Sequence, residues 1–127
     1  MLSYVATTRG ITVAVHPVYL DEPSSFFDMR FAFGYAVHIT NRTGTDVQLV
    51  RRRWTIQEAS GQLQDIAGDE PLRAQPVIEP GQTHVYDGTC TIASFEGVVD
   101  GNFLVQGADG ERFRVPIPQF PLQAAAN

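Results

Sequence analysis

Residues 30–40 read Arg-Phe-Ala-Phe-Gly-Tyr-Ala-Val-His-Ile-Thr, and their alternation is the dominant pattern of the chain. Large apolar side chains occupy every second position, while alanine, glycine and histidine fill the positions between them. Successive side chains of a β-strand point to opposite faces, so a period of two predicts a long strand with one buried face. The apolar face would hold Phe31, Phe33, Tyr35, Val37 and Ile39, and the small-residue face Ala32, Gly34 and Ala36.

The same alternation recurs near both ends of the chain, at Ile11, Val13 and Val15 and at Phe113, Val115 and Ile117. Turn signals rich in glycine, proline, asparagine and aspartate separate such runs at short intervals, at 41–44, 60–61, 80–81, 87–88, 100–101 and 109–110. Helical spacing is not sustained between them, so no crossover helix is available to join parallel strands. We therefore predict seven or eight antiparallel strands in a sandwich or barrel.

The length and composition are those of one ordinary globular domain. The chain has 127 residues, of which 43% are hydrophobic and 18% charged. A chain of this size buries enough surface to fold around its own core without a disulfide or metal. We expect a single domain over 1–127, with a core from about 11 to 122 and flanking tails at 1–10 and 123–127.

The charged residues exclude several classes of function. A net charge of −5 argues against general binding to nucleic acid or anionic membranes, because such binding depends on cationic side chains. All nine basic residues are arginines, so no lysine is present to form a Schiff base or serve a P-loop. The common catalytic motifs are also missing, and we predict no catalytic residue and no cofactor.

The sequence also carries signals about location. The first thirty residues lack the basic start and apolar run of a signal peptide, and Cys90 has no second cysteine to pair with. No stretch approaches the roughly 20 apolar residues that span a bilayer. We therefore expect a cytoplasmic protein without membrane insertion, with Cys90 as a buried, inert thiol.

Two segments interrupt the alternation and are predicted to be exposed loops, at 21–28 and 67–75. The first contains Phe26 and Phe27, which are costly to leave in water because burying each is worth about 1.5 to 3 kcal/mol. They either fold back onto the core or belong to a contact patch.

Separated segments of the chain, from about Ile11 to Leu122, resemble the ApaG proteins. The segments that carry the resemblance are Val18 to Glu22, Arg30 to Asn41, Val47 to Val50 with Arg52 and Trp54, Gln75-Pro76, Glu79 to Gly81, and Gly110 to Phe120. The resemblance implies an immunoglobulin-like or fibronectin type III-like sandwich of two antiparallel sheets. It also implies an association with cobalt and magnesium tolerance or efflux, and relatives in which the domain is fused to other modules as a protein-recognition unit.

One loop departs from the family pattern. The family often carries Gly-x-Gly-x-x-Gly before its Gln-Pro, but here residues 68–73 read Gly-Asp-Glu-Pro-Leu-Arg. A pyrophosphate cradle needs glycines so that backbone amides can approach the anion, and two added acids repel phosphate. We therefore expect no phosphate site in this loop.

The run Arg51-Arg52-Arg53-Trp54 contains a conflict of parity. Strand alternation puts Arg52 on the same face as Trp54, which we expect in the core. An unpartnered guanidinium is expensive to bury, so Arg52 requires a polar partner, a β-bulge or an opening onto a cleft. We predict structural roles for Arg52 and Trp54. Arg51 and Arg53 fall on the opposite face of the strand. They are either solvated surface charges or a pair of guanidiniums that binds a carboxylate or phosphate.

Metal-binding signals are weak. His16, His38 and His84 fall on separate predicted strands, and we expect them to be independent, although oxygens of Asp21, Glu22, Asp28, Asp69 or Glu70 could in principle hold magnesium. We predict no metal ligands.

Two functional hypotheses follow. The first is a non-enzymatic protein-binding module, a monomer or weak homodimer whose partner is an unidentified protein. Its candidate surface combines Phe26, Phe27, Arg51 and Arg53 with the small residues Ala32, Gly34 and Ala36, which could equally serve core packing. The alternative is an accessory protein that responds to a small ligand or divalent cation.

Overall fold

The computed structural model describes residues 3–71 and 74–124, with side chains for 3–65 and 74–124. Its ten strands are β1 (Tyr4–Thr8), β2 (Ile11–Ser25), β3 (Arg30–Asn41), β4 (Val47–Glu58), β5 (Leu63–Pro71), β6 (Val77–Ile78), β7 (Thr83–Ile92), β8 (Glu96–Gly107), β9 (Arg112–Pro116) and β10 (Phe120–Gln123). Within the described ranges there is no helix that is long and apolar enough to cross a membrane.

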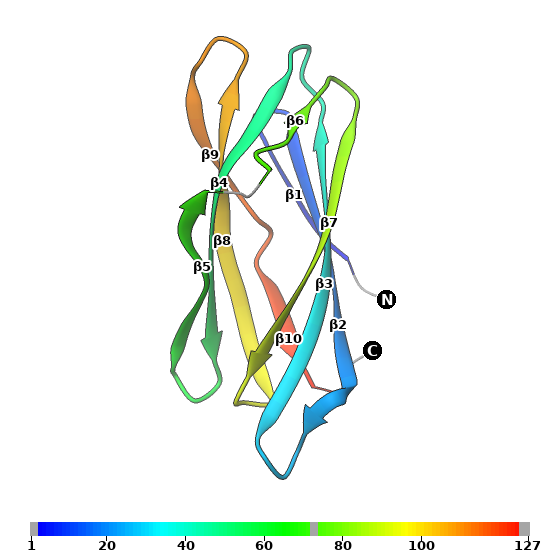
Figure 1. Ribbon diagram of the computed structural model, residues 1–127, viewed down its shortest axis with the longest axis vertical. Coiled ribbons are helices and arrows are strands. Elements are labelled where there is room, and N and C mark those ends of the chain that lie inside the picture. Colours follow the sequence, from blue (N-terminus) through cyan, green and yellow to red (C-terminus); the bar gives the residue numbers. More distant parts are fainter. Residues whose placement is uncertain (1–2, 72–73, 125–127) are drawn as a thin grey trace.

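The strands form two antiparallel sheets that face each other along the long axis of the molecule (Figure 1). One sheet has the order β1-β2-β3-β7. The other has the order β10-β8-β4-β5, with β6 paired to β4 and β9 paired to β8. The predicted sandwich of two antiparallel sheets is therefore confirmed, and β3 occupies 30–41 as the alternation indicates.

The structure corrects several predicted boundaries. Strand β1 lies inside the expected N-terminal tail, because Tyr4 of this strand packs on Phe120. Strand β2 continues through most of the predicted loop at 21–28, by means of a register shift between Leu20 and Ser25. Strand β5 extends to residue 71, through the first part of the predicted loop at 67–75. The additional strands β1 and β6 bring the number among the described residues to ten, where seven or eight were expected.

A single hydrophobic cluster fills the space between the sheets. It includes all five apolar residues of the alternating stretch in β3, each at most 4% exposed. Trp54 is fully buried at its centre, with ring centroids 5.1 Å from Tyr35, 5.9 Å from Phe103 and 6.0 Å from Phe120. The indole therefore contacts side chains from both sheets.

A β-bulge in β4 changes the parity of the strand ahead of Arg52. Leu49 pairs with Val105 of β8, but the next pair is Arg51 with Leu104, so Val50 is one extra residue in β4. Before the bulge the odd-numbered residues Val47 and Leu49 face the core, and after it the even-numbered Trp54, Ile56 and Glu58 do. A bulge of this kind reverses which face each later side chain occupies. The bulge precedes Arg52, so Arg52 still shares the inward face of Trp54.

Candidate functional site

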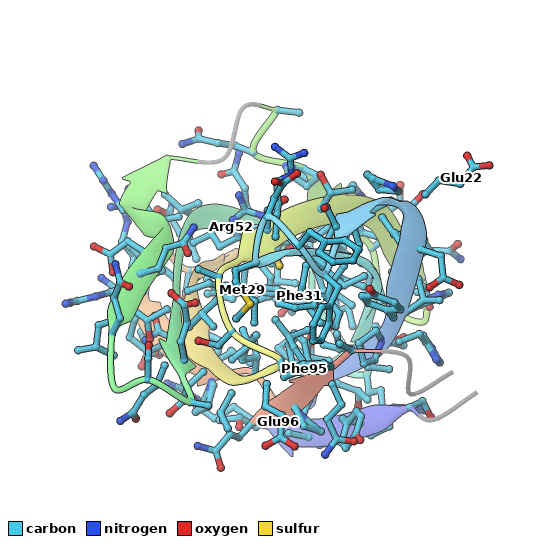
Figure 2. The ribbon with its side chains drawn as sticks, turned by 90° about the horizontal axis from the view of Figure 1, so that it is seen from below. Glu22, Met29, Phe31, Arg52, Phe95 and Glu96 are labelled. Carbon is cyan, nitrogen blue, oxygen red and sulfur yellow. The ribbon has the colours of Figure 1, made fainter. Side chains whose placement is uncertain are left out.

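Exposed apolar side chains gather at one end of the sandwich, and we call this group the aromatic tip. It consists of Phe26, Phe27 and Met29 from the β2–β3 turn and Phe95 from the β7–β8 turn. Their exposed fractions are 60%, 96%, 48% and 46%. The β2–β3 hairpin forms the lower end of the molecule in Figure 1, and Figure 2, viewed from that end, shows Met29, Phe31 and Phe95 close to the middle of the view.

The two phenylalanines of the β2–β3 turn have different surroundings. The Phe26 ring lies 5.3 Å from Phe95 and 6.4 Å from Phe31, which is itself buried. Phe95 in turn lies 4.9 Å from Phe31, so the core continues outward into the tip. Phe27 touches this stack only through Phe26, at 6.4 Å, and is almost fully exposed. Phe26 therefore folds back onto the core in part, whereas Phe27 does not.

Hydrogen bonds hold the β2–β3 turn in shape. The Ser24 hydroxyl donates to the Leu20 carbonyl at 2.6 Å and accepts from the Ala32 amide at 2.9 Å, which bridges the irregular part of β2. The Met29 amide donates to the Phe26 carbonyl at 3.1 Å, and Met29 has a φ of 49°. Left-handed backbone is unfavourable for methionine, so the surrounding bonds must fix this conformation.

The buried Glu58 holds the β7–β8 turn, which carries Phe95 of the aromatic tip. Its carboxylate accepts a hydrogen bond from the Ala93 amide at 2.8 Å, and only 4% of Glu58 is exposed. The Ala124 amide donates to the Phe95 carbonyl at 2.9 Å, and the Ala59 amide donates to the Glu96 carbonyl at 3.0 Å. Sequence reasoning missed Glu58 and Phe95. The sequence contained one indication of Glu58: it lies two residues after Ile56, so strand alternation places it on the same inward face.

The predicted interaction residues do not form one surface. Ala32, Gly34 and Ala36 alternate with core residues of β3 and so lie on the outer face of the four-stranded sheet. A side chain at Gly34 would contact Val18 and Leu20 of neighbouring β2, at 3.4 and 3.8 Å. Aliphatic side chains of β2 therefore flank this small-residue strip, of which Ala32 is 5% exposed and Gly34 is buried, so it is not an open surface.

Arg51 and Arg53 lie on the outer face of the opposite, six-stranded sheet, since they alternate with the inward Arg52 and Trp54. The aromatic tip, the small-residue strip and these arginines thus occupy three separate parts of the molecule.

Arg52 enters the sandwich among aromatic side chains. Its guanidinium carbon lies 5.6 Å from the ring centre of Trp54 and 5.8 Å from that of Tyr86. Burial raises the pKa of Tyr86 to about 12 and also raises the pKa of Tyr35, while the neighbouring Arg52 charge opposes both shifts. Contacts of this kind stabilise a partly desolvated cation through the ring faces.

Histidines and Cys90 show no catalytic arrangement. The rings of His16 and His38 lie 5.1 Å apart on neighbouring strands, so these two are not independent as predicted, because β2 and β3 pair in the register that brings them together. Across the part of the chain that the structure describes, no three His, Cys, Asp or Glu residues are grouped to hold a metal. The side chains of Asp69 and Glu70 lie outside the described residues. Burial raises the pKa of the Cys90 thiol to about 11, which disfavours the reactive thiolate.

The contacts of Arg52 predict that its side chain stabilises the fold. A second arginine substitution separates this effect from the loss of one positive charge. We expect Arg52→Ala to lower the free energy of unfolding by more than about 1 kcal/mol, because the aromatic contacts and burial of the side-chain stem are both lost. Arg53→Ala is the matched control and should change it by less than about 0.5 kcal/mol, as usual for an exposed position. Urea denaturation measures both. Equal midpoints for the two variants would contradict the structural role.

Comparison with known proteins agrees with the resemblance. The model of the ApaG domain family matches residues 21–107. Protein ApaG from Brucella canis is 39% identical over 119 residues, covering 94% of this chain and 92% of that protein. Protein ApaG from Sinorhizobium fredii is 37% identical over 121 residues, covering 95% and 93%.

Solved structures give the same result. A Bordetella pertussis protein whose crystal structure is described as that of an ApaA protein superposes with a TM-score of 0.86 at 31% identity, covering 92% of this chain and 95% of that one. The family model spans more than half of the chain, and the sequence relatives span nearly all of it. This chain belongs to the ApaG domain family.

Proposed function

We propose that this chain is a non-enzymatic recognition module that binds a protein partner through the aromatic tip. The observation that carries the proposal is the exposure of Phe26, Phe27 and Phe95 on a hydrogen-bonded scaffold. Isolated apolar residues are common on protein surfaces, but a cluster of aromatic side chains is typical of an interaction site. Covering Phe27, which is 96% exposed, would contribute about 1.5 to 3 kcal/mol to binding, and the half-buried Phe26 and Phe95 would contribute less.

The fixed backbone of the tip supports binding. A flexible loop must be ordered when a partner binds, and that loss of entropy weakens affinity. Here Glu58 and Ser24 hold the two turns before any partner arrives. Aromatic side chains have few rotatable bonds, so they add contact area at a low entropic cost. The tip therefore has the properties of a prepared binding surface.

The wider architecture is compatible with this role. Immunoglobulin-like and fibronectin type III-like sandwiches, to which we assign this fold, present loops at the ends of a rigid core. We further propose that the chain acts in the cytoplasm as a monomer or weak homodimer and performs no chemistry of its own.

The proposal predicts that Phe27→Ser abolishes partner capture without affecting folding. Wild type and variant, immobilised in parallel, would be exposed to extract of the source cells, and retained proteins quantified by mass spectrometry. Loss of one central aromatic side chain can cost 2 kcal/mol or more, which weakens binding about thirtyfold. Phe27 is 96% exposed, so the stability of the variant should be unchanged.

Val85→Ser is the matched control, because Val85 is 50% exposed in β7, away from the tip. Proteins retained by wild type and by Val85→Ser should be missing from Phe27→Ser. If Phe27→Ser retains the same proteins as wild type, or if wild type retains none above background, the proposal is wrong.

A second proposal follows the association of the family with cobalt and magnesium, and the His16–His38 pair favours it. Two imidazoles on neighbouring strands could supply two nitrogen ligands to a cation such as Co²⁺. A ligand at about 100 times its dissociation constant adds about 2.7 kcal/mol of stability. We therefore expect Co²⁺ to raise the melting temperature of wild type and not of His38→Ala. A melting temperature that Co²⁺, Mg²⁺ and EDTA leave unchanged would remove this second function.

A further inference from the structure

Strand β7 forms one edge of the four-stranded sheet and runs along the length of the sandwich (Figure 1). It pairs with β3 on one side, and over residues 3–71 and 74–124 no other strand pairs with it. An unpaired edge presents a row of backbone donors and acceptors that matches another extended chain. Strand β7 therefore offers this sheet a position for a further strand.

The register shows which residues of β7 direct their backbone groups to the open side. The Asn41 amide donates to the Gln82 carbonyl at 3.0 Å, and these two residues flank the pair of Thr40 with Thr83. A hydrogen bond in this position marks a non-hydrogen-bonded pair, and the two kinds of pair alternate along an antiparallel ladder. The N–H and C=O groups that point away from β3 thus belong to alternate, exposed residues of β7. They are Thr83, Val85, Asp87, Thr89 and Thr91.

The other described strand edges are protected against such pairing, and β7 is not. Strand β1 has five residues and β6 has two. Strands β5, β9 and β10 contain Pro71, Pro116 and Pro121. Short strands, prolines and charges are the usual means by which proteins block an edge. Strand β7 has ten residues, no proline, no lysine or arginine, and a single carboxylate, Asp87.

We infer that β7 binds an extended segment of a partner protein, which adds to the sheet as a strand and places a lysine or arginine opposite Asp87. Asp87 is exposed near the middle of β7 and forms no ion pair with any described residue. Opposite charges that face each other across two strands stabilise their pairing. The backbone groups of β7 thus supply the hydrogen bonds, and Asp87 sets the register. This surface is separate from the aromatic tip, and the inference does not depend on it.

The inward positions of β7 indicate which side chains flank the cation. Tyr86 and Cys90 are half-buried and pack against the hydrophobic core. The residues on either side of the cation in an added strand would point inward and lie next to this row. Apolar side chains there would cover the exposed parts of Tyr86 and Cys90, which is favourable. The segment therefore alternates apolar residues with polar ones, and the cation occupies a polar position.

Asp87 disfavours a second copy of this chain as the added strand. Two copies of β7 that pair over their full length around a two-fold axis match the residues with open backbone groups, Thr83 with Thr91 and Val85 with Thr89. The central pair is then Asp87 with Asp87 of the other copy. Like charges directly opposite each other destabilise a strand pair. A cationic segment of a different protein has the complementary charge.

The test uses a fluorescein-labelled peptide of nine residues that alternates threonine and valine, with arginine in place of the central threonine, measured by fluorescence anisotropy. Methyl groups on two valine amides, which point away from β7, prevent the peptide from pairing with itself. Wild type should bind this peptide. A glutamate in place of the arginine should weaken binding about tenfold, because a cross-strand attraction becomes a repulsion. Asp87→Lys should reverse this order and bind the glutamate peptide more tightly.

Two changes test the backbone pairing itself. Moving the methyl groups to the amides of arginine and one threonine, which face β7, should abolish binding. Thr89→Pro should weaken it at least tenfold, since proline removes an N–H on the open side and keeps the bonds to β3. Circular dichroism melting would verify that this variant is folded.

Phe27→Ser is the matched control for the aromatic tip and should bind the peptide within twofold of wild type. Val85→Ser changes a side chain of the same edge but no backbone group, and should also bind it. No binding by wild type, an unchanged peptide preference in Asp87→Lys, or equal binding of the two methylated peptides would overturn the inference. A wild-type dimer in analytical ultracentrifugation that Thr89→Pro dissociates would overturn it in favour of a second copy.

Discussion

One extra residue in β4 determines which side chains this domain buries and which it displays. Val50 interrupts the pairing of β4 with β8, and the strand changes parity there. Without that change the inward positions would continue from Leu49 to residues 51 and 53, placing two arginines in the core. Burying unpartnered guanidiniums costs several kcal/mol each, whereas burying Trp54 and Ile56 is favourable. The bulge therefore lets one strand contribute both to the core and to a charged surface.

The aromatic tip and the outward arginines of β4 both depend on this change of parity. After the bulge, inward Glu58 reaches the Ala93 amide and holds the turn that carries Phe95. Outward Arg51 and Arg53 join the arginines of β9 across β8. The same parity also turns Arg52 inward. Its contacts with the rings of Trp54 and Tyr86 offset part of the desolvation free energy that burying a guanidinium costs.

The sequence predicted features that depend on local pattern and missed those that depend on pairing. Alternation in 30–40 correctly placed the long strand β3, and the conflict at Arg52 indicated that a bulge was one possible solution. The location of the bulge could not be read, because it is defined by the partner strand. The same limit explains why His16 and His38 were treated as independent, and why Arg112 and Arg114 were not joined to Arg51 and Arg53. The second half of β5, residues 67–71, was predicted to be a loop because its acids, glycine and proline are typical of loops.

Thiol accessibility tests the change of parity most directly. In a background with Cys90→Ala, cysteine would be placed singly at positions 49 and 53, which have the same parity in an uninterrupted strand, and the rate of reaction with a soluble thiol reagent measured. Leu49 is 1% exposed and Arg53 is exposed. The account predicts that the cysteine at 49 is protected until the protein unfolds, while the cysteine at 53 reacts at nearly the rate of a free thiol. Similar rates at the two positions in the folded protein would contradict it.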